Sequence, residues 1–509
     1  MASLVFQNVS FAYPGSPVRL FDGIDFGVSE GWAGIVGANG AGKTTLLQLA
    51  CGLLSPAAGT IHRPERVVYC PQRTDEPMPE LASLLSSFDG EAYRLRGALE
   101  VEDDFIDRWD TLSHGERKRA QIAACLWTRP TLFAIDEPTN HLDARARAIV
   151  FDALRAFRGV GLLVSHDRGL LDQLCTNSLF LFPPEVTLRS GGYTDARAGL
   201  DAENQRVLER KQQATRDRRR LRTEMEERRR HVQEAHKARS KRGIDRKDHD
   251  AKEKIDQARI ADGGAGKNLR QLEGRLRQAS EQEASLIARK ERATGISLRG
   301  RRSRRNALFS IEATQLPLGE NRQLAVPDLL MQPGDRIALI GPNGGGKSTL
   351  VRHILSLLDL PPEEVVSIPQ EIRAEAARDA LAAVKKLAGS RLGEVMQWVS
   401  RLGSDPHQLL DSLTPSPGEV RKLMLSLRMT DAPVLLILDE PTNHMDLPSV
   451  ECLESALREY PGGLLLVSHD LRFLQPLTTA TWEIHPDGEQ RGVSRLCMRH
   501  RPPVADPGG

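Results

Sequence analysis

The sequence predicts an α/β protein in which one domain occurs twice and an α-helical hairpin joins the two copies. Several short motifs recur in the same order at an almost constant separation, and a highly charged stretch lies between the copies. Short aliphatic runs such as 434–438 and 464–467 have the length and composition of buried parallel strands. The expected boundaries are a first domain over 1–195, a linker over 196–304, a second domain over 305–490 and a short flexible tail over 491–509.

The composition allows two or three domains with complete cores, because the chain has 509 residues of which 40% are hydrophobic. The net charge of +2 argues against a general polyanion-binding protein. The charge is uneven, however: residues 201–300 hold 28 Lys and Arg against 18 Asp and Glu, and the remaining residues sum to −8. A basic centre between mildly acidic flanks predicts a negatively charged partner for that centre.

The cysteines and the apolar runs predict a cytoplasmic protein without a membrane domain. None of the six cysteines has the spacing of a zinc site or of a disulfide framework, and scattered thiols are typical of a reducing compartment. The first ten residues lack the pattern of a signal peptide. No apolar run approaches the roughly 18 residues that a membrane span requires.

The internal repeat is defined by three motif pairs. GANGAGKTT at 37–45 recurs as GPNGGGKST at 341–349, IDEPTNHLD at 135–143 recurs as LDEPTNHMD at 438–446, and LLVSHD occurs at 162–167 and again at 465–470. Lys43 and Lys347 are 304 residues apart, and Asp136 and Asp439 are 303 apart. Chance recurrence of short motifs does not explain why both order and spacing are kept.

The glycine-rich motif of each copy predicts a nucleotide site rather than a structural turn. A strand precedes it (33–36 or 336–340), a helical pattern follows it, and glycines let backbone N–H groups surround phosphate oxygens. The lysine is expected to reach the β- and γ-phosphates, and the next hydroxyl is expected to bind Mg²⁺. The predicted nucleotide-binding residues are Gly37, Asn39, Gly40, Gly42, Lys43, Thr44 and Thr45 in the first copy, and Gly341, Asn343, Gly344, Gly346, Lys347, Ser348 and Thr349 in the second.

Two carboxylates follow an aliphatic strand in each copy. The first acid, Asp136 or Asp439, is expected to hold Mg²⁺ through water. The second acid, Glu137 or Glu440, is expected to polarise the water that attacks the γ-phosphate. The alternative, a pair of solvated turn acids, fits poorly, because a buried strand that ends in two acids is costly without a cation or polar partners. His166 and His469 each follow another aliphatic strand and are expected to contact the γ-phosphate.

These motifs make both halves resemble ATP-binding cassettes, the ATPase domains of the ABC superfamily, over nearly all of 1–190 and 305–485. The resemblance implies mixed sheets with flanking helices and a helical subdomain in each half. The signature segment is matched by LSHGERKRAQIA at 112–123 and by PSPGEVRKLMLS at 415–426. The resemblance also implies catalytic and Mg²⁺-binding roles for Gln72 and Gln370, and nucleotide contacts for Asp143, Asp446 and the adenine-stacking Tyr13; the corresponding segment 312–320 has no aromatic residue.

ABC cassettes pair head to tail, so the resemblance implies that each ATP lies between the P-loop of one copy and the signature segment of the other. The residues expected to close on nucleotide at Lys347 are Ser113, Gly115 and Glu116, and those expected at Lys43 are Ser416, Gly418 and Glu419. His114 and Pro417 depart from the usual signature, and proline has no N–H to donate. A monomer with one intramolecular cassette pair is expected.

The linker extends the resemblance to the ABC-F subfamily of soluble ATPases that act on ribosomes. EPTNHLD replaces the EPTSALD that is commoner in transporters. Val207, Ala214, Leu221, Met225, Val232 and Ala235 form one apolar stripe, and Leu269, Leu272, Leu276, Ala279 and Leu286 form a second. With breakers at Gly243 and 263–266, the pattern predicts two antiparallel helices with a narrow coiled-coil seam and a basic tip. The alternative is a solvated spacer.

The resemblance implies that the linker enters the ribosomal exit site and approaches rRNA and P-site tRNA. It leaves open a housekeeping translation factor and an antibiotic-resistance protein. Only 41 residues separate Gln72 from Ser113, which leaves no room for the extra arm of some family members and slightly favours resistance. The basic run 301–305 is a candidate phosphate contact. Two alternatives are a DNA-binding ATPase of repair or branched-DNA processing and a detached transporter ATPase.

Overall fold

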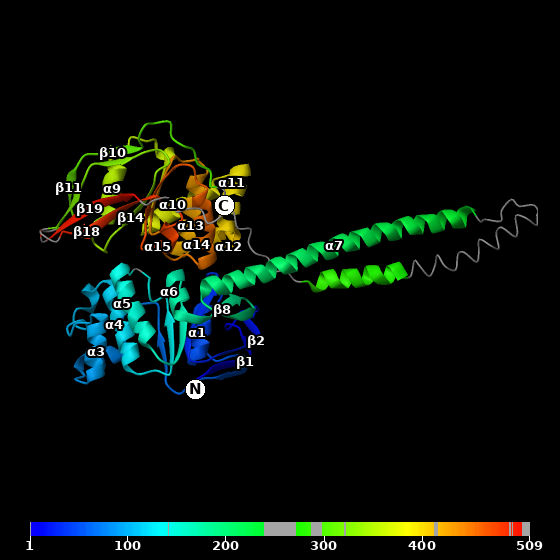
Figure 1. Cartoon of the computed structure of the whole chain (residues 1–509), viewed down its shortest axis with the longest axis horizontal. Helices are drawn as coiled ribbons and strands as arrows, with labels where there is room; N and C mark the ends of the chain where they lie inside the picture. The colour runs from blue at the N-terminus through cyan, green and yellow to red at the C-terminus, as the bar shows by residue number, and fades with distance from the viewer. Residues whose placement is uncertain are drawn as a thin grey trace, which may run out of the picture. The chain divides into compact units, whose positions relative to one another are not determined.

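The computed structural model describes residues 2–140, 142–238, 271–286, 298–319, 322–411, 416–487, 490 and 492–500 (Figure 1). The chain divides into two compact units. One unit consists of Met1–Ala196 together with Arg292–Gly509, and it contains both cassettes. The other unit is Arg197–Glu291, which is the linker.

The first cassette is built on a six-stranded sheet in the order β5-β6-β7-β3-β8-β9, in which every pair is parallel except β8 and β9. A three-stranded antiparallel sheet in the order β2-β1-β4 lies in the same cassette. The strands are β1 Leu4–Phe11, β2 Phe21–Val28, β3 Gly31–Gly37, β4 Ala58–His62, β5 Val67–Cys70, β6 Leu132–Asp136, β7 Val160–Val164, β8 Cys175–Phe182 and β9 Glu185–Ser190.

The helices of this cassette carry the motifs. Helix α1 follows the P-loop, α4 carries the signature segment, and α2 and α3 pack against α4 as the helical subdomain. The helices are α1 Lys43–Cys51, α2 Pro79–Ser86, α3 Gly90–Leu99, α4 His114–Trp127, α5 Ala144–Ala156 and α6 Arg168–Leu174, with a 3₁₀ turn at Trp109–Thr111.

The second cassette repeats this plan. An eight-stranded mixed sheet has the order β11-β12-β19-β18-β14-β17-β16-β15, and β10 pairs with β13. Its strands are β10 Phe309–Ile311, β11 Thr314–Pro317, β12 Gln323–Val326, β13 Leu329–Met331, β14 Arg336–Ile340, β15 Val365–Ile368, β16 Leu435–Asp439, β17 Gly463–Val467, β18 Ala480–Pro486 and β19 Val493–His500. Its helices are α9 Lys347–Leu357, α10 Ala374–Lys385, α11 Gly389–Arg401, α12 Pro406–Asp411, α13 Pro417–Met429, α14 Leu447–Arg458 and α15 Leu471–Leu474, with a 3₁₀ turn at Pro362–Glu364.

The parallel strands bring the motifs to one edge of each sheet. In the first cassette β6 and β3 both pair with β7, so the P-loop after β3, the acids at the end of β6 and His166 after β7 meet at the carboxyl ends of three adjacent strands. Strands β14, β17 and β16 repeat this order in the second cassette. Loops at the carboxyl ends of parallel strands are the usual ligand sites of such sheets.

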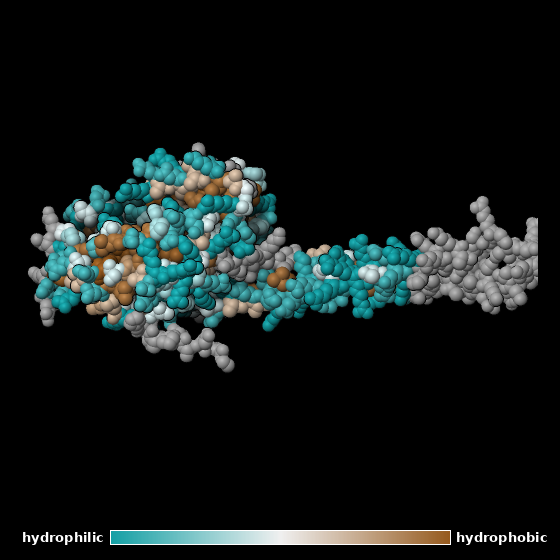
Figure 2. Space-filling model, turned by 90° about the horizontal axis from the view of Figure 1, so that it is seen from above, coloured by the Kyte–Doolittle hydropathy of each residue, from teal (hydrophilic) through white to brown (hydrophobic). Residues whose placement is uncertain are grey.

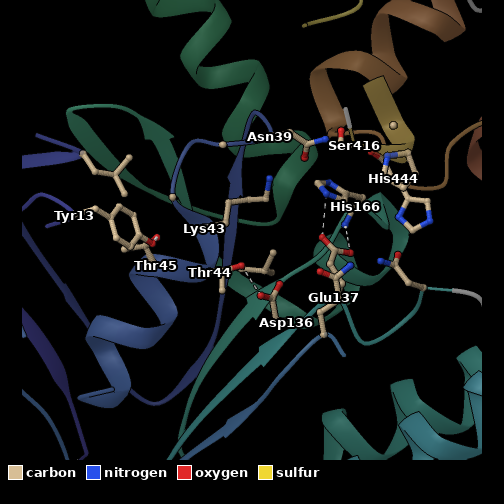
Figure 3. Close-up of a pocket in the computed structure, with 18 residues that line it drawn as sticks. Tyr13, Asn39, Lys43, Thr44, Thr45, Asp136, Glu137, His166, Ser416 and His444 are labelled. Atoms are coloured by element: carbon tan, nitrogen blue, oxygen red, sulfur yellow. Dashed lines mark hydrogen bonds and ion pairs between the residues drawn. The ribbon is translucent and has the colours of Figure 1, made fainter. Parts of the chain in front are cut away.

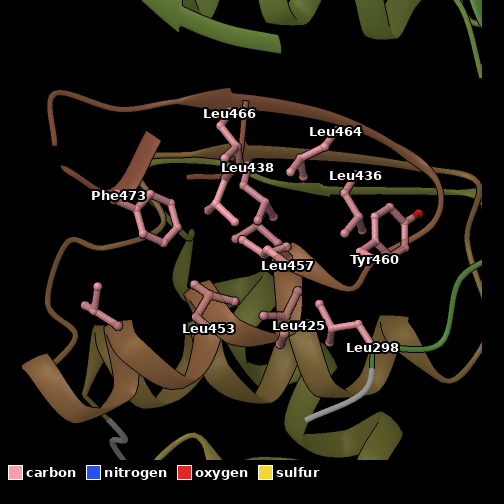
Figure 4. Close-up of a cluster of buried hydrophobic side chains, with 14 of the residues drawn as sticks. Leu298, Leu425, Leu436, Leu438, Leu453, Leu457, Tyr460, Leu464, Leu466 and Phe473 are labelled. Carbon is pink, nitrogen blue, oxygen red and sulfur yellow. The ribbon is translucent and has the colours of Figure 1, made fainter. Parts of the chain in front are cut away.

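Apolar side chains of the central strands form the core. All five residues of β6, β7, β16 and β17 are buried, as expected for strands covered on both faces. One core cluster of the second cassette packs Leu436 and Leu438 of β16 and Leu464 and Leu466 of β17 against helix residues (Figure 4). Leu298 belongs to the same cluster and is 5% exposed.

Two segments near the expected boundaries pack with the second cassette. The residues just before 305 belong to the expected linker, yet Leu298 lies in the core of the second cassette and Arg299 pairs with Glu394 at 2.9 Å. The segment expected to be a flexible tail includes β19, which pairs antiparallel with β18 and parallel with β12. The physical reason is that β19 supplies the neighbour that both strands need for their backbone hydrogen bonds, and it buries Leu496 against the core.

The linker is helical, as predicted. Helix α7 spans Tyr193–Ala238, which at 1.5 Å per residue is about 70 Å long. A second helix covers residues 271–285. Thr215 and Arg218 both contact Glu283, at 3.0 and 2.9 Å, whereas Arg229 contacts Glu273 at 2.7 Å. The residue number of the partner falls along the second helix as the residue number rises along α7, so the two helices are antiparallel.

The described part of the hairpin has a narrow apolar seam and a hydrophilic exterior. Ala214 and Leu272 are 7% and 3% exposed, and Val207, Leu221, Met225 and Leu276 are half-buried. The surface around this seam is mostly hydrophilic in Figure 2. The expected basic tip, its breakers at Gly243 and 263–266, and Leu269 lie outside the described residues, as do the side chains of Val232 and Ala235.

Candidate ATP sites

The P-loop of the first cassette places its lysine and hydroxyls around one cavity (Figure 3). Gly40 and Gly42 have φ angles of 79° and 90°, in the left-handed region that favours glycine. A Cβ on Gly42 would lie 2.9 Å from the ring of Phe21, so the loop has no room for a side chain there. The Lys43 ammonium donates to the carbonyls of Gly37 and Ala38 at 3.0 and 3.2 Å, which keeps the charge inside the loop.

The residues predicted to bind Mg²⁺ lie close together in each site. The Thr44 hydroxyl donates to Asp136 Oδ2 at 2.6 Å, and Gln72 lines the same cavity. In the second site Ser348 donates to Asp439 at 3.1 Å, and Gln370 lines the cavity there. A hydroxyl, a carboxylate and an amide oxygen are donors that fit Mg²⁺, which prefers oxygen ligands and keeps several waters.

The second acid of each pair lies beside the switch histidine, the name used here for His166 and His469. His166 Nε2 lies 3.1 Å from Glu137 Oε1, and the His166 backbone N–H donates to Glu137 Oε2 at 3.2 Å. His469 Nε2 lies 3.6 Å from Glu440 Oε1. Both Oε1 atoms are buried and accept no hydrogen bond from a described residue. A buried acceptor without a partner fits a carboxylate that takes a water molecule as its ligand.

Burial shifts the ionisation of these groups. It raises the pKa of Glu137 to about 8, with the charge of Asp136 as the next cause, and raises the pKa of Glu440 to about 7, with Asp439 next. Burial lowers the pKa of His166 and that of His469 to about 3 each. The positive charge of the neighbouring P-loop lysine, Lys43 or Lys347, is the next cause. The histidines are therefore neutral near pH 7. Groups with such shifts cluster at functional sites.

The two cavities differ in the residues that line them. The cavity at Lys43 has a volume of about 600 Å³, and Ser416, Pro417, Gly418 and His444 of the other cassette line it (Figure 3). The cavity at Lys347 has a volume of about 290 Å³. Its described lining comes from the second cassette alone, without Ser113, Gly115 or Glu116. The predicted cross-cassette partners of the first site thus line the cavity at Lys43.

The signature serines begin their helices with matching capping boxes. Ser113 caps α4 and Ser416 caps α13, and each hydroxyl accepts from the backbone N–H three residues later at 3.3 Å. Glu116 and Glu419 return the contact by accepting from the serine backbone N–H at 2.8 Å. The two glutamates therefore orient the signature serine. Pro417 occupies the first turn of α13, where its missing N–H removes a group that the helix itself does not use.

The aspartates at 143 and 446 join each cassette to the P-loop of the other. The backbone N–H of Asn39 donates to Asp446 Oδ2 at 2.7 Å. In the reciprocal contact the backbone N–H of Asn343 donates to Asp143 Oδ2 at 3.4 Å. Each aspartate also caps the helix that follows it, α5 or α14. The contact with the P-loop of the first site is the shorter of the two.

Comparison with known proteins identifies the family. A domain family described as ABC transporter matches residues 21–140 and 324–443. The ribosome protection protein VmlR of Bacillus subtilis is 29% identical, over 96% of this chain and 87% of VmlR. The tylosin resistance ATP-binding protein TlrC of Streptomyces fradiae is 32% identical, over 89% of this chain and 92% of TlrC.

The chain belongs to the ABC-F subfamily of ATP-binding cassette proteins. It is accordingly an ABC-type ATP hydrolase, as predicted. The fold agrees: a crystal structure of the archaeal ribosome recycling factor aABCE1 with the stalk protein aP1 superposes with a TM-score of 0.61 and 18% identity, over 96% of this chain and 89% of that one. None of the described helices has the length and apolar composition needed to cross a bilayer.

The residue at the predicted adenine-stacking position differs between the two halves of this ABC-F chain. In the first, Phe11 pairs with Phe21, and Tyr13 follows two residues later with its hydroxyl 2.6 Å from that of Thr45. In the second, Leu316 pairs with Leu324, so Leu318 takes the place of Tyr13. Arg322 lies beside it and donates to the Gly344 carbonyl at 2.6 Å. Both residues line the second cavity, so a cation accompanies the apolar contact there.

Two buried cations of the ABC-F signature helices escaped the sequence analysis. Lys118 of α4 donates to Pro71 O at 2.5 Å and lies 3.4 Å from Asp136 O. Arg421, the equivalent residue of α13, donates to Gln370 O at 2.5 Å and to Glu440 O at 2.6 Å. They tie the signature helix to the loop of Gln72 or Gln370 and to the acidic strand end. The available signal was a cation five residues after each signature serine.

Proposed function

We propose that this ABC-F protein is a cytoplasmic ATPase that acts on the ribosome and protects it from an antibiotic. The observation that carries the proposal is the basic helical hairpin between two complete cassettes. Similarity over nearly the full length to TlrC, whose name specifies tylosin resistance, and to VmlR, named as a ribosome protection protein, supports it.

In the proposed cycle each P-loop binds the phosphates of one ATP, with Lys43 or Lys347 on the β- and γ-phosphates. Glu137 and Glu440, once ionised, accept a proton from the attacking water, and the neutral switch histidines hydrogen-bond the γ-phosphate. Mg²⁺, bound through Thr44 and Asp136 or Ser348 and Asp439 with Gln72 or Gln370 nearby, would neutralise charge that develops on the phosphates. Closure of the cassettes on ATP orders the signature serines against the nucleotide.

The linker carries the proposed contact with RNA. Arg218 and Arg229 pair with Glu283 and Glu273 across the hairpin. Arg219 and Arg220, by contrast, are exposed and have no acidic partner among the described residues. Arginine binds phosphate oxygens in a bidentate geometry, so exposed arginines along the helix fit a nucleic-acid backbone. The intramolecular cassette pair requires one chain, so a monomer on the ribosome is proposed.

Co-sedimentation tests the proposal. The protein is mixed with purified ribosomes in ADP, ATP or a slowly hydrolysed ATP analogue, and with branched or duplex DNA at the same salt concentration. We expect pelleting with ribosomes that the analogue increases and ADP reverses. Preferential binding of DNA would replace the ribosomal proposal with a DNA-processing function.

Cell-free translation tests the protective role. Tylosin is added at a concentration that halves synthesis, followed by the parent protein and ATP. We expect synthesis to recover, and we expect no recovery with a Lys43→Ala, Lys347→Ala variant. Ribosome binding without recovery, for tylosin and for other inhibitors of the exit-site region, would instead favour a housekeeping translation factor.

A further inference from the structure

Arg147 joins the two ATP sites in a way that no motif specifies. It lies in the second turn of α5, on the first cassette, four residues after Asp143. Its Nη1 donates to the backbone carbonyl of His469, the switch histidine of the second site, at 3.0 Å. The same nitrogen lies 3.6 Å from Oδ2 of Asp167, the residue after the first switch histidine. One guanidinium therefore touches the switch loops of both cassettes.

The surroundings of Arg147 make this contact stronger than a surface ion pair. The side chains of Arg147 and Asp167 are 25% and 17% exposed. Burial raises the pKa of Asp470, which follows His469, and the charges of Arg168 and Arg147 act against that rise. Arg168 also faces this cluster and pairs with Glu454 of the other cassette at 2.7 Å. Exposed ion pairs contribute little to stability because solvent and salt screen the charges, and partial burial weakens this screening.

The second cassette has a different residue type at the position that corresponds to Arg147. The position in the second cassette that matches Arg147, four residues after Asp446, is Val450. Val450 is 1% exposed and belongs to the hydrophobic core of its own cassette. The second cassette therefore presents an apolar core residue where the first presents a cation. The described charges that lower the pKa of His166, after burial, are Lys43, Lys422 and His444 instead.

We infer that Arg147 is a positioning residue for the second ATP site and couples that site to the first. It fixes the backbone that carries His469, and hence the distance from the imidazole to a bound γ-phosphate. Through Asp167 it also relates the His469 loop to the His166 loop. This inference rests on the proposed γ-phosphate contact of the switch histidines, and it adds that Arg147 of the first cassette supports the switch histidine of the second site.

The test measures each site alone. Glu137→Gln leaves only the second site able to hydrolyse ATP, and Glu440→Gln leaves only the first. Arg147→Gln is placed in both backgrounds, because glutamine keeps a donor but loses the charge and the reach. We expect about a tenfold fall in kcat when only the second site is active, which corresponds to about 1.4 kcal/mol, and less than about a twofold change when only the first is active. Arg147→Lys should recover part of the loss.

The matched control is Arg145→Gln, because Arg145 lies on the same helix, is 78% exposed and pairs with Glu100 of its own cassette. It should leave both rates unchanged. If Arg147→Gln lowers both rates equally, Arg147 only stabilises the interface between the cassettes, and the inference is wrong. The absence of a loss in both backgrounds would also overturn the inference. If the Glu137→Gln and Glu440→Gln parents hydrolyse ATP at the normal rate, the catalytic proposal fails instead.

Discussion

Glu137 and Glu440 end buried strands with the same unusual backbone, a φ of 46°. Positive φ is strained for a glutamate, and both backbone N–H groups are held by the carbonyl of the adjacent strand, at 2.9 and 2.8 Å. In this conformation each carboxylate lies 3.1 or 3.6 Å from its switch histidine. An identical distortion in both cassettes indicates that the position of the carboxylate is what the fold maintains.

The first prediction concerns these two glutamates together. Glu137→Gln with Glu440→Gln should preserve ATP binding and abolish hydrolysis, because the amide keeps the shape and cannot accept a proton from water. The turnover rate should fall by at least about two orders of magnitude, in line with the typical loss of a general base of about 10² to 10⁴. The variant should stay closed, remain on ribosomes and block cell-free translation. Phosphate release and pelleting are measured, and normal turnover would remove both residues from the catalytic role.

The switch histidines give a prediction for pH. Their pKa of about 3 in the fold lies below the unfolded value of about 6.5. The unfolded chain therefore binds more protons between about pH 3 and 6.5, and stability due to the neutral histidines is lost as pH falls below about 6.5. The free energy of unfolding falls by up to about 1.4 kcal/mol for each histidine and each pH unit in that range.

Replacing both histidines with glutamine should remove this dependence in the nucleotide-free protein. Thermal unfolding of parent and variant is compared at pH 7 and pH 5, and the Tm of the variant relative to the parent should rise at the lower pH. Glu137 and Glu440 have raised pKa values and act in the opposite direction, but they are present in both proteins. A difference in Tm that does not change with pH would mean that the histidines are not buried neutral.

At the scale of elements, the β11–β12 hairpin explains why the second site differs from the first. Leu318 and Arg322 flank its turn, and a Cβ on Gly346 would lie 2.9 Å from Leu318. Leu318 therefore packs on the P-loop, where Leu20 and Phe21 approach Gly42 in the first cassette, and it offers no ring for stacking. A base on Leu318 gains apolar contact, with the guanidinium of Arg322 beside it in the same cavity.

A third prediction exchanges these residues. Leu318→Tyr should tighten nucleotide binding at the second site by about tenfold, since base–aromatic stacking contributes about 1–3 kcal/mol. Tyr13→Leu should weaken the first site by a similar factor. Fluorescent ATP is titrated with the other site disabled by Lys43→Ala or Lys347→Ala, and Leu318→Met is the control because it changes shape without adding a ring. Equal affinity of the Tyr and Met variants would exclude stacking at this position.

The elements also show where prediction from sequence succeeds. The P-loops, acidic strand ends and switch histidines depend on local motifs, and the sequence indicated the strands that carry them. The cations Lys118, Arg421 and Arg147 were missed because their partners include backbone carbonyls distant in sequence, which no local motif indicates. Strand β19 was missed for a similar reason: VSRLCMRH buries little apolar surface and is fixed by pairing with two strands that no local signal connects to it.

At the scale of the whole molecule, two unequal ATP sites share one linker. The reciprocal contacts differ, at 2.7 Å from Asn39 to Asp446 and 3.4 Å from Asn343 to Asp143. Further contacts connect the cassettes, namely Arg168 with Glu454, Arg472 with Asp172, and Tyr193 with Glu451. Tyr193 is also the first residue of α7. The first residue of the linker helix is therefore hydrogen-bonded to the second cassette.

The last prediction separates the roles of the linker arginines. Arg219→Gln with Arg220→Gln removes two exposed charges that have no acidic partner among the described residues, so the hairpin should keep its Tm. The slope of log affinity for ribosomes against log salt should flatten by roughly 0.7 to 0.9 for each phosphate that is no longer bound. Arg218→Gln with Arg229→Gln is the matched pair, because it removes the same charge but breaks the ion pairs with Glu283 and Glu273 and should lower hairpin stability as well.

A third variant neutralises basic residues of the predicted tip, which lies outside the described residues: Arg239, Lys241, Arg242, Arg246 and Lys247. ATP hydrolysis by the protein alone should not change, because these residues are far in sequence from every nucleotide motif. Ribosome-stimulated hydrolysis and protection of translation should fall more per removed charge than in the Arg219, Arg220 variant, since the tip is the part expected to reach the functional centre. If tip and shaft variants bind ribosomes as the parent does, the linker is a solvated spacer, and its charge serves solubility instead of RNA recognition.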